Sequence, residues 1–297
     1  MKEYYAASVG FFDGVHAGHR FLIEELKKEA AAKGLKTMLV TFAIHPRKVL
    51  HDTFQPQLLT SHEEKMALLK STGVDRVKVL NFTTEMARLT AREFIFQVLA
   101  TALKVRFLLV GHDHRFGHNR EDGFPEYLIY GKEAGIEVLQ ASRYSIQNQD
   151  HISSSTIRRL IQSGSIEEAN TLLGYAYQFS GYVVSGYQVG RKIGFPTANL
   201  RVEPQEKLIP GPGVYAVEVI WEQNSYKGMM NIGMRPTIDN TQQLSIEVHI
   251  FNFQEDIYHE LLQVQFLYKI RDEKKFESLD QLILQLKEDK RLVMGHV

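Results

Sequence analysis

Two histidines, His16 and His19, stand three positions apart in the segment FFDGVHAGHR, with glycines at 10, 14 and 18 close by. Imidazole rings at this spacing can donate to the phosphates of ATP and stabilise charge that builds on them during a transfer, without a covalent intermediate. Glycines allow the backbone to approach such a ligand closely. The pattern also fits an ordinary loop, since turns favour Gly and Asp. A metal site would need a third ligand, and none is supplied nearby.

A second group of chemical interest lies in GYQVGRKIGFPTANL, residues 186–200. Glycines that bracket a basic pair can cradle phosphates, and the oxygens of Thr197 and Asn199 are hard ligands that suit Mg²⁺. The alternative is a Gly/Pro/Asn loop of a β-domain. Further along, the alternation in LSIEVHIFNF places Glu247 and His249 on the face opposite Ile246 and Val248. A carboxylate at such a position is usually a solvated residue.

Two more polar segments accompany strand-like runs of the first half. The Ser/Thr cluster in ISSSTIRRLIQSG, residues 152–164, opens a helical pattern. Its hydroxyls can cap the helix, and with Arg158 they also suit a triphosphate. The loop VGHDHRFGHNREDG, residues 110–123, follows a strand of apolar residues. It is interpreted as a ligand-lining loop, with a flexible polar loop or a histidine metal site as alternatives.

Composition limits the classes of partner. The 297 residues contain 44% hydrophobic and 24% charged residues, as expected of a protein with a proper core. Lys+Arg and Asp+Glu both number 35, so no overall basic field attracts nucleic acid or an anionic membrane. Cysteine is absent, which excludes disulfides and thiolate sites. With no signal or membrane-spanning pattern, we expect a soluble cytoplasmic protein. The sequence does not indicate an oligomeric state.

The segment that contains His16 and His19 must be positioned by the alternating strands and helices of the first half of the chain. Strands are expected at 4–10, 36–42, 76–82, 106–113 and 135–141, and helices at 20–34, 61–73, 90–103 and 152–164. This order predicts a parallel sheet covered on both faces, with ligands at the carboxyl ends of the strands. A short helix over 165–174 leads to a change of character at about residue 176, which divides the chain into domains 1–175 and 176–297.

The second half reads as an antiparallel barrel or sandwich. Strand-like runs broken by Gly, Pro and Asn are expected at 177–186, 213–221, 225–233, 244–251 and 261–270. A helix over 278–291 follows them.

The motifs together resemble one family. GFFDGVHAGH resembles the G-x-F-D-G-x-H-x-G-H signature of the bacterial bifunctional riboflavin kinase/FAD synthetases, and GRKIGFPTAN resembles their kinase motif nearly letter for letter. The segments at 41–50, 110–123, 152–158, 244–253 and 268–282 are similar to further elements of the family. The resemblance implies an N-terminal Rossmann-like nucleotidylyltransferase domain with a parallel sheet. It also implies a C-terminal kinase domain built as a six-stranded antiparallel β-barrel with a terminal helix.

The resemblance also implies two activities, phosphorylation of riboflavin to FMN and adenylylation of FMN to FAD, with Mg²⁺ and ATP as required partners. In the first domain it implies ATP-binding residues Gly10, Phe11, Asp13, His16, His19, Ser154, Ser155, Thr156 and Arg158, and flavin-binding residues Asp113 and Phe116. In the second it implies ATP-binding residues Gly190, Arg191, Gly194, Pro196, Thr197 and Asn199, flavin-binding residues Arg271 and Phe276, and Glu247 as general base. His16 and His19 would be catalytic, and Thr197 and Asn199 would hold the metal.

The sequence departs from the family pattern in the first domain. His114 stands where an aromatic residue is usual, and Ala43 and Ile44 replace residues that are often polar or proline. A protein with the kinase activity alone is therefore one alternative. A flavin-binding regulator without catalysis is another, although a pure binder would not need Glu247.

Overall fold

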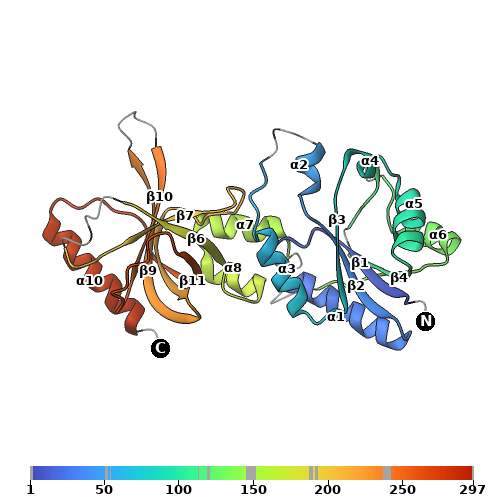
Figure 1. Ribbon diagram of the computed structural model, residues 1–297, viewed down its shortest axis with the longest axis horizontal. Helices are drawn as coiled ribbons and strands as arrows, with labels where there is room; N and C mark the ends of the chain where they lie inside the picture. The colour runs from blue at the N-terminus through green and yellow to red at the C-terminus, as the bar shows by residue number, and fades with distance from the viewer. Residues whose placement is uncertain are drawn as a thin grey trace. The chain divides into compact units, whose positions relative to one another are not determined.

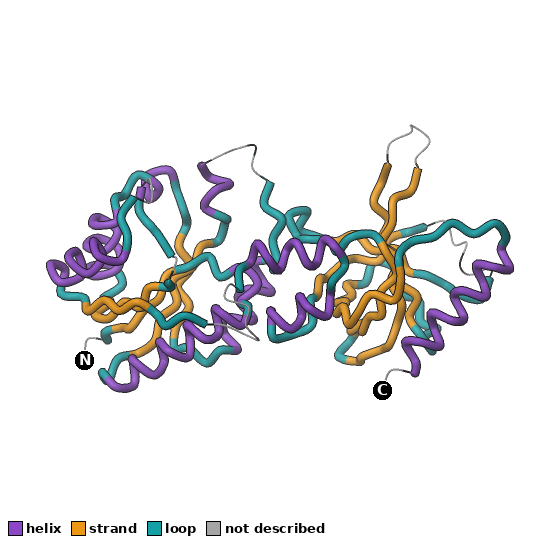
Figure 2. The backbone as a smooth tube through the Cα atoms, turned by 180° about the vertical axis from the view of Figure 1, so that it is seen from behind, coloured by secondary structure: helices purple, strands orange, loops and turns teal. Residues whose placement is uncertain are grey.

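The computed structural model describes residues 3–50, 53, 55–112, 114–118, 121–144, 152–186, 190, 193–236 and 242–295. The chain divides into two compact units, Met1–Ser154 and Ser155–Val297 (Figures 1 and 2). Helix α8 (Ile166–Leu173) groups with the second unit, since the Asn170 amide donates to Phe266 O at 2.9 Å. The functional boundary expected after residue 175 stays a prediction.

The first unit is built on a parallel sheet, as predicted. Its described residues form five strands in the order β3-β2-β1-β4-β5. These are β1 (Tyr5–Val9), β2 (Lys36–Phe42), β3 (Arg76–Leu80), β4 (Val105–Val110) and β5 (Glu137–Gln140). Because β1 pairs with both β2 and β4, the strand order reverses at β1. Ligands of such sheets bind beyond the carboxyl ends of the strands at this point.

Helices cover both faces of that sheet. They are η1 (Asp13–Val15), α1 (Ala17–Ala32), α2 (Pro46–Leu50), α3 (His62–Ser71), α4 (Thr84–Ala87), α5 (Ala91–Glu93), the π-helix η2 (Phe94–Ala102) and α6 (Phe124–Ala134). Apolar residues of α1 and α3 pack on one face, and those of η2 and α6 pack on the other (Figure 1). Helix α3 begins with a capping box, in which the Ser61 and Glu64 side chains each accept the backbone N–H of the other residue.

The second unit is a closed antiparallel barrel, which confirms the barrel and excludes the sandwich. Among its described residues the strand order is β10-β7-β6-β11-β8-β9. The strands are β6 (Gln178–Val184), β7 (Ala198–Val202), β8 (Gly213–Trp221), β9 (Asn224–Pro236), β10 (Gln242–Ile250) and β11 (Leu261–Arg271). Helix α10 (Leu279–Gly295) packs on the outside of the barrel through Val293, and α7 (Ser154–Ser163) precedes α8 (Figure 2).

Candidate active sites

The turn after β1 brings the two predicted histidines together. His16 immediately precedes α1, and its Nδ1 accepts the backbone N–H of His19 at 3.4 Å. The two rings stack with their centroids 3.7 Å apart. Gly18 allows this packing, because a Cβ at that position would lie 3.3 Å from the His16 ring. The pair therefore lies at a helix N-terminus, where backbone N–H groups favour an anion.

The electrostatics of this pair favour a neutral His19. Burial lowers the pKa of His19 well below its usual value, and the neighbouring His16 and His114 lower it further. The buried Nδ1 of His19 has no hydrogen-bond partner among the residues that the structure describes. A neutral imidazole still donates one N–H, so the His19 ring can contact a phosphate without first gaining a proton.

Asp13 is buried and anchors the same turn. Its carboxylate accepts the backbone N–H groups of Leu59 and Thr60 at 3.1 and 3.2 Å. The Thr60 hydroxyl in turn accepts the N–H of Gly14 at 3.1 Å. Ser154 donates its hydroxyl to the backbone oxygen of Asp13 at 3.0 Å. These bonds fasten the loop around the histidines, and direct contact of Asp13 or Ser154 with ATP stays a prediction.

Gly10 and Phe11 join the end of β1 to β2. The N–H of Gly10 donates to Val40 O at 3.0 Å, and the Thr41 hydroxyl donates to Phe11 O at 3.1 Å. The Phe11 ring meets the His45 ring edge-on, with centroids 4.7 Å apart. Gly10 and Phe11, both predicted to bind ATP, are therefore hydrogen-bonded to β2 at the start of the turn that leads to His16.

A buried lysine, Lys65, packs against the Phe11 ring. No sequence pattern indicated it. Lys65 of α3 is 2% exposed, and its ammonium is 3.8 Å from the centre of the Phe11 ring. It donates to Phe42 O at 2.9 Å. Burial lowers the pKa of Lys65 to about 8, and the nearby Asp13 charge acts in the opposite direction. The turn therefore packs against a lysine that loses its proton at a lower pH than an ordinary lysine does.

The remaining predicted residues of the adenylyl-transfer site lie on two segments. Ser155, Thr156 and Arg158 lie in the first turns of α7, which belongs with the second unit. Phe116 stacks on Tyr127 with centroids 4.3 Å apart, and its backbone N–H donates to the Tyr127 hydroxyl at 2.9 Å. Asp113 lies outside the described residues. The ligand contacts of all these residues stay predictions.

In the barrel, the structure brings Glu247 to the predicted metal ligands. Strands β10 and β7 pair Glu247 with Asn199, and the Thr197 hydroxyl donates to Oε2 of Glu247 at 3.1 Å. The space that a Cβ on Gly186 would take is filled by the Asn199 side chain. Glu247 therefore contacts Thr197 and lies opposite Asn199 in the ladder, although it is distant from both in the sequence.

The loop before β7 is held from two sides. Gly190 O accepts the N–H of Phe195 at 2.9 Å, and Gly194 adopts a positive φ of 82°. His249 donates its Nδ1–H to Pro196 O at 2.7 Å, and burial lowers the pKa of His249. The predicted phosphate-binding residues Gly190, Gly194 and Pro196 thus form one folded loop. Arg191 lies outside the described residues.

Arg271 and Phe276, the predicted flavin residues, lie together next to α10. The Arg271 guanidinium is 5.8 Å from the Phe276 ring centre. It also donates to the carboxylate of Asp289, with distances of 2.8–3.1 Å, and Asp289 is fully buried. The sequence pattern did not single out Asp289. The Asp289 carboxylate fixes where the guanidinium points, whereas contact with a flavin stays a prediction.

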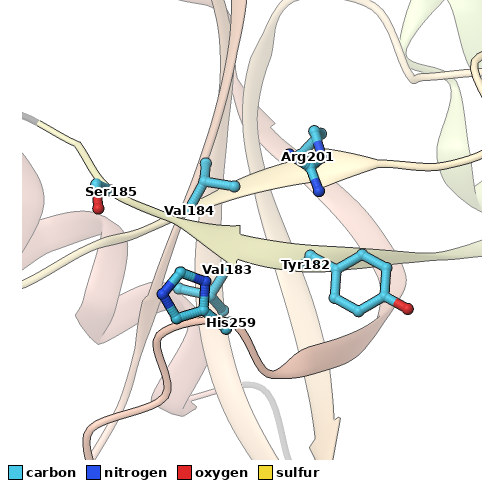
Figure 3. A pocket seen from close by; sticks show the side chains of 6 residues that line it. All are labelled: Tyr182, Val183, Val184, Ser185, Arg201 and His259. Carbon is cyan, nitrogen blue, oxygen red and sulfur yellow. The ribbon is translucent and has the colours of Figure 1, made fainter.

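A hollow opens beside β7. It has a volume of about 320 Å³ and is lined by side chains of β6, β7 and the segment before β11 (Figure 3). Tyr182 pairs across the ladder with Arg201, and Val184 pairs with Asn199. His259, from the segment before β11, also lines the hollow (Figure 3). The hollow therefore adjoins the strand pair that carries Asn199.

No group of three or more His, Cys, Asp or Glu side chains among the described residues could hold a metal ion. None of the helices within the described ranges is long and apolar enough to span a membrane.

Comparisons with known proteins match both units. The FAD synthetase family model matches residues 1–156, and the riboflavin kinase family model matches residues 173–296. The bifunctional riboflavin kinase/FMN adenylyltransferase of Listeria monocytogenes is 39% identical over 285 residues, 96% of this chain and 90% of that protein. The protein of the same name from Escherichia coli strain K12 is 38% identical over 283 residues, 95% and 89% of the two chains.

A solved structure shares the whole architecture. It is named as a macrolide-efflux protein from Streptococcus pneumoniae, is 32% identical, and superposes with a TM-score of 0.89 over 100% of this chain and 96% of that one. A parallel-sheet unit that matches the FAD synthetase family model and a closed barrel that matches the riboflavin kinase family model define a two-domain transferase. The chain belongs to the family of bifunctional riboflavin kinase/FMN adenylyltransferases.

Proposed function

We propose that this chain makes FAD in two ATP-dependent steps. The barrel unit phosphorylates riboflavin to FMN, and the parallel-sheet unit then adenylylates FMN and releases pyrophosphate. The observation that supports this most directly is the Glu247 carboxylate beside the Thr197 hydroxyl, at 3.1 Å. A flavin-binding protein without turnover has no use for this arrangement.

In the kinase step, Glu247 is the general base. It accepts the proton of the terminal ribityl hydroxyl of riboflavin as that oxygen attacks the γ-phosphorus of ATP, and ADP leaves. The loop that contains Gly190, Gly194 and Pro196, together with Arg191, surrounds the phosphates. Arg271 and Phe276 contact the flavin.

The donor set of this site fits Mg²⁺. Thr197 and Asn199 offer a hydroxyl and an amide oxygen, and Glu247 lies within hydrogen-bond distance of the Thr197 hydroxyl, at 3.1 Å. Hard oxygen ligands of this kind, used with substrate phosphates, are what Mg²⁺ prefers. Bound with ATP, the ion would neutralise charge on the transferred phosphoryl group. Thr197 and Asn199 would hold it.

In the adenylyl-transfer step, the FMN phosphate attacks the α-phosphorus of a second ATP. His16 and His19 donate to the phosphates and stabilise the charge of the departing pyrophosphate. The α1 N-terminus supports the same charge. Ser154, Ser155, Thr156 and Arg158 complete the ATP contacts, as the resemblance implies, and Asp113 and Phe116 contact the flavin. We propose that both steps occur in the cytoplasm, in keeping with a sequence that contains no cysteine.

One assay separates the alternatives. Purified protein is incubated with riboflavin, ATP and Mg²⁺, and the flavins are resolved by chromatography. FMN and FAD should both form, and an excess of EDTA should stop both steps. FMN without FAD would leave a riboflavin kinase, and no product at all would leave a flavin-binding protein.

A further inference from the structure

A second hydroxyl contacts the general base, and the mechanism above gives it no role. Ser245 lies two positions before Glu247 on β10, so its side chain projects from the same face of the strand. Its hydroxyl donates to Oε1 of Glu247 at 3.0 Å. Ser245 is only 9% exposed, whereas Glu247 is more accessible. The buried serine therefore holds the more exposed Glu247 carboxylate by a hydrogen bond from the interior of the protein.

The two carboxylate oxygens of Glu247 differ because of this contact. Oε1 accepts from Ser245, and Oε2 accepts from Thr197 at 3.1 Å. Thr197 is the proposed metal ligand, so Oε2 is the oxygen on the side of the ATP phosphates. A carboxylate held at one oxygen by a short side chain cannot rotate freely, and its second oxygen keeps a fixed direction.

The surroundings of Ser245 connect it to the flavin segment. In the ladder Ser245 is opposite Gly233 of β9. The Glu273 carboxylate occupies the space that a Cβ on Gly233 would take. Glu273 lies between Arg271 and Phe276, the proposed flavin residues. At the Ser245–Gly233 pair, strand β10, which carries Glu247, therefore lies close to the segment that carries Arg271 and Phe276.

We propose that Ser245 is a positioning residue of the riboflavin kinase reaction, an inference that rests on the proposed function of Glu247. Its hydrogen bond to Oε1 directs Oε2 of Glu247 to the terminal hydroxyl of riboflavin. The O–H bond of that hydroxyl breaks, its proton passes to Oε2, an O–P bond forms to the γ-phosphorus, and the bond between the β,γ-bridging oxygen and the γ-phosphorus breaks to release ADP. Ser245 itself exchanges no proton with the substrate.

The test compares Ser245→Ala, Ser245→Thr and Ser225→Ala. Ser225 also donates to a glutamate, Glu218, but on the exposed β8–β9 ladder, so its variant is a matched control. For Ser245→Ala we expect kcat of riboflavin phosphorylation to fall about 10- to 100-fold, the effect of one lost hydrogen bond to a charged group, with KM values changed less than about twofold. Ser245→Thr keeps the hydroxyl and should stay within about threefold of wild type. Ser225→Ala should have no effect.

Urea unfolding followed by the fluorescence of Trp221, which lies on β8 of the same barrel, reports whether the barrel of each variant is folded. The FMN-to-FAD step of the same molecules shows whether the first unit is affected. Three results would overturn the proposal: an unchanged kcat in Ser245→Ala, equal losses in both activities with a lower unfolding temperature, or no rescue by Ser245→Thr. The proposed function fails separately, because in that case the wild-type protein itself forms no FMN from riboflavin.

Discussion

Lys65 should make the stability of the first unit depend on pH in an unusual direction. Its pKa is about 8 in the folded protein, against 10.5 for an ordinary lysine. Between these values the unfolded chain binds more protons than the folded one, so the free energy of unfolding rises with pH. At 1.36 kcal/mol per pKa unit, the rise is about 2 kcal/mol between pH 7 and 9.5, and about 3 kcal/mol by pH 11. Below pH 8 the full cost of burying the charge is present.

The measurement compares wild type with Lys65→Met by urea unfolding at several pH values. The chain has a single tryptophan, Trp221, at the end of β8, so its fluorescence reports the barrel. A circular-dichroism transition that fluorescence does not share reports the parallel-sheet unit. Lys70, exposed on the same helix, provides the control variant Lys70→Met.

The diagnostic quantity is the free energy of unfolding of wild type minus that of Lys65→Met. The lost contacts to Phe11 and Phe42 shift this difference by the same amount at every pH, whereas the titration of Lys65 gives it a slope. A difference that stays level from pH 7 to 9.5 would refute the argument that burial depresses this pKa.

Three further predictions follow from the two sites. Glu247→Gln should lower riboflavin phosphorylation by about 10²- to 10⁴-fold and leave FMN-to-FAD conversion intact, as measured by separate assays with riboflavin and with FMN. If both activities disappeared, the assignment of separate sites would be wrong. His19→Ala should do the reverse, with FAD formation reduced about 10²-fold or more and FMN accumulating; normal FAD formation would exclude a role for the ring. Asp289→Ala should lower the free energy of unfolding of the barrel by about 1.5–3 kcal/mol, because it removes the charged hydrogen bonds that the partly buried Arg271 guanidinium makes to this carboxylate. Trp221 fluorescence in urea measures this, and a change below about 1 kcal/mol would show that the pair is dispensable.

Much of the fold could be predicted from periodicity, but several elements could not. All five strands of the parallel sheet were expected, and the three central strands β2, β1 and β4 contain nearly continuous apolar runs. Strand β7 was not, because it begins inside the P-T-A-N motif, and Asn is a poor strand former that suggests a loop. Helix α1 starts at Ala17, earlier than the apolar pattern indicates, because the His16 side chain caps it. An imidazole is not among the usual capping groups.

The sequence predicted those candidate site residues that lie within short motifs, and it missed residues that only the tertiary fold brings to the site. The motifs H-x-G-H and P-T-A-N singled out His16, His19, Thr197 and Asn199 as candidates, because each pair lies within one short segment of the sequence. Lys65 was missed because its partners come from other elements, and nothing in an amphipathic helix reveals that one lysine points inward. Partners that are brought together by the tertiary fold leave no local signal in one sequence.

The cap on α1 also determines the protonation form of a candidate catalytic ring. Since Nδ1 of His16 accepts the His19 N–H, the neutral ring must carry its proton on Nε2. Only one of the two imidazole tautomers is therefore compatible with an intact helix start. The fold selects that tautomer before any nucleotide arrives, and His16 can offer an Nε2–H donor to an anion while it remains uncharged.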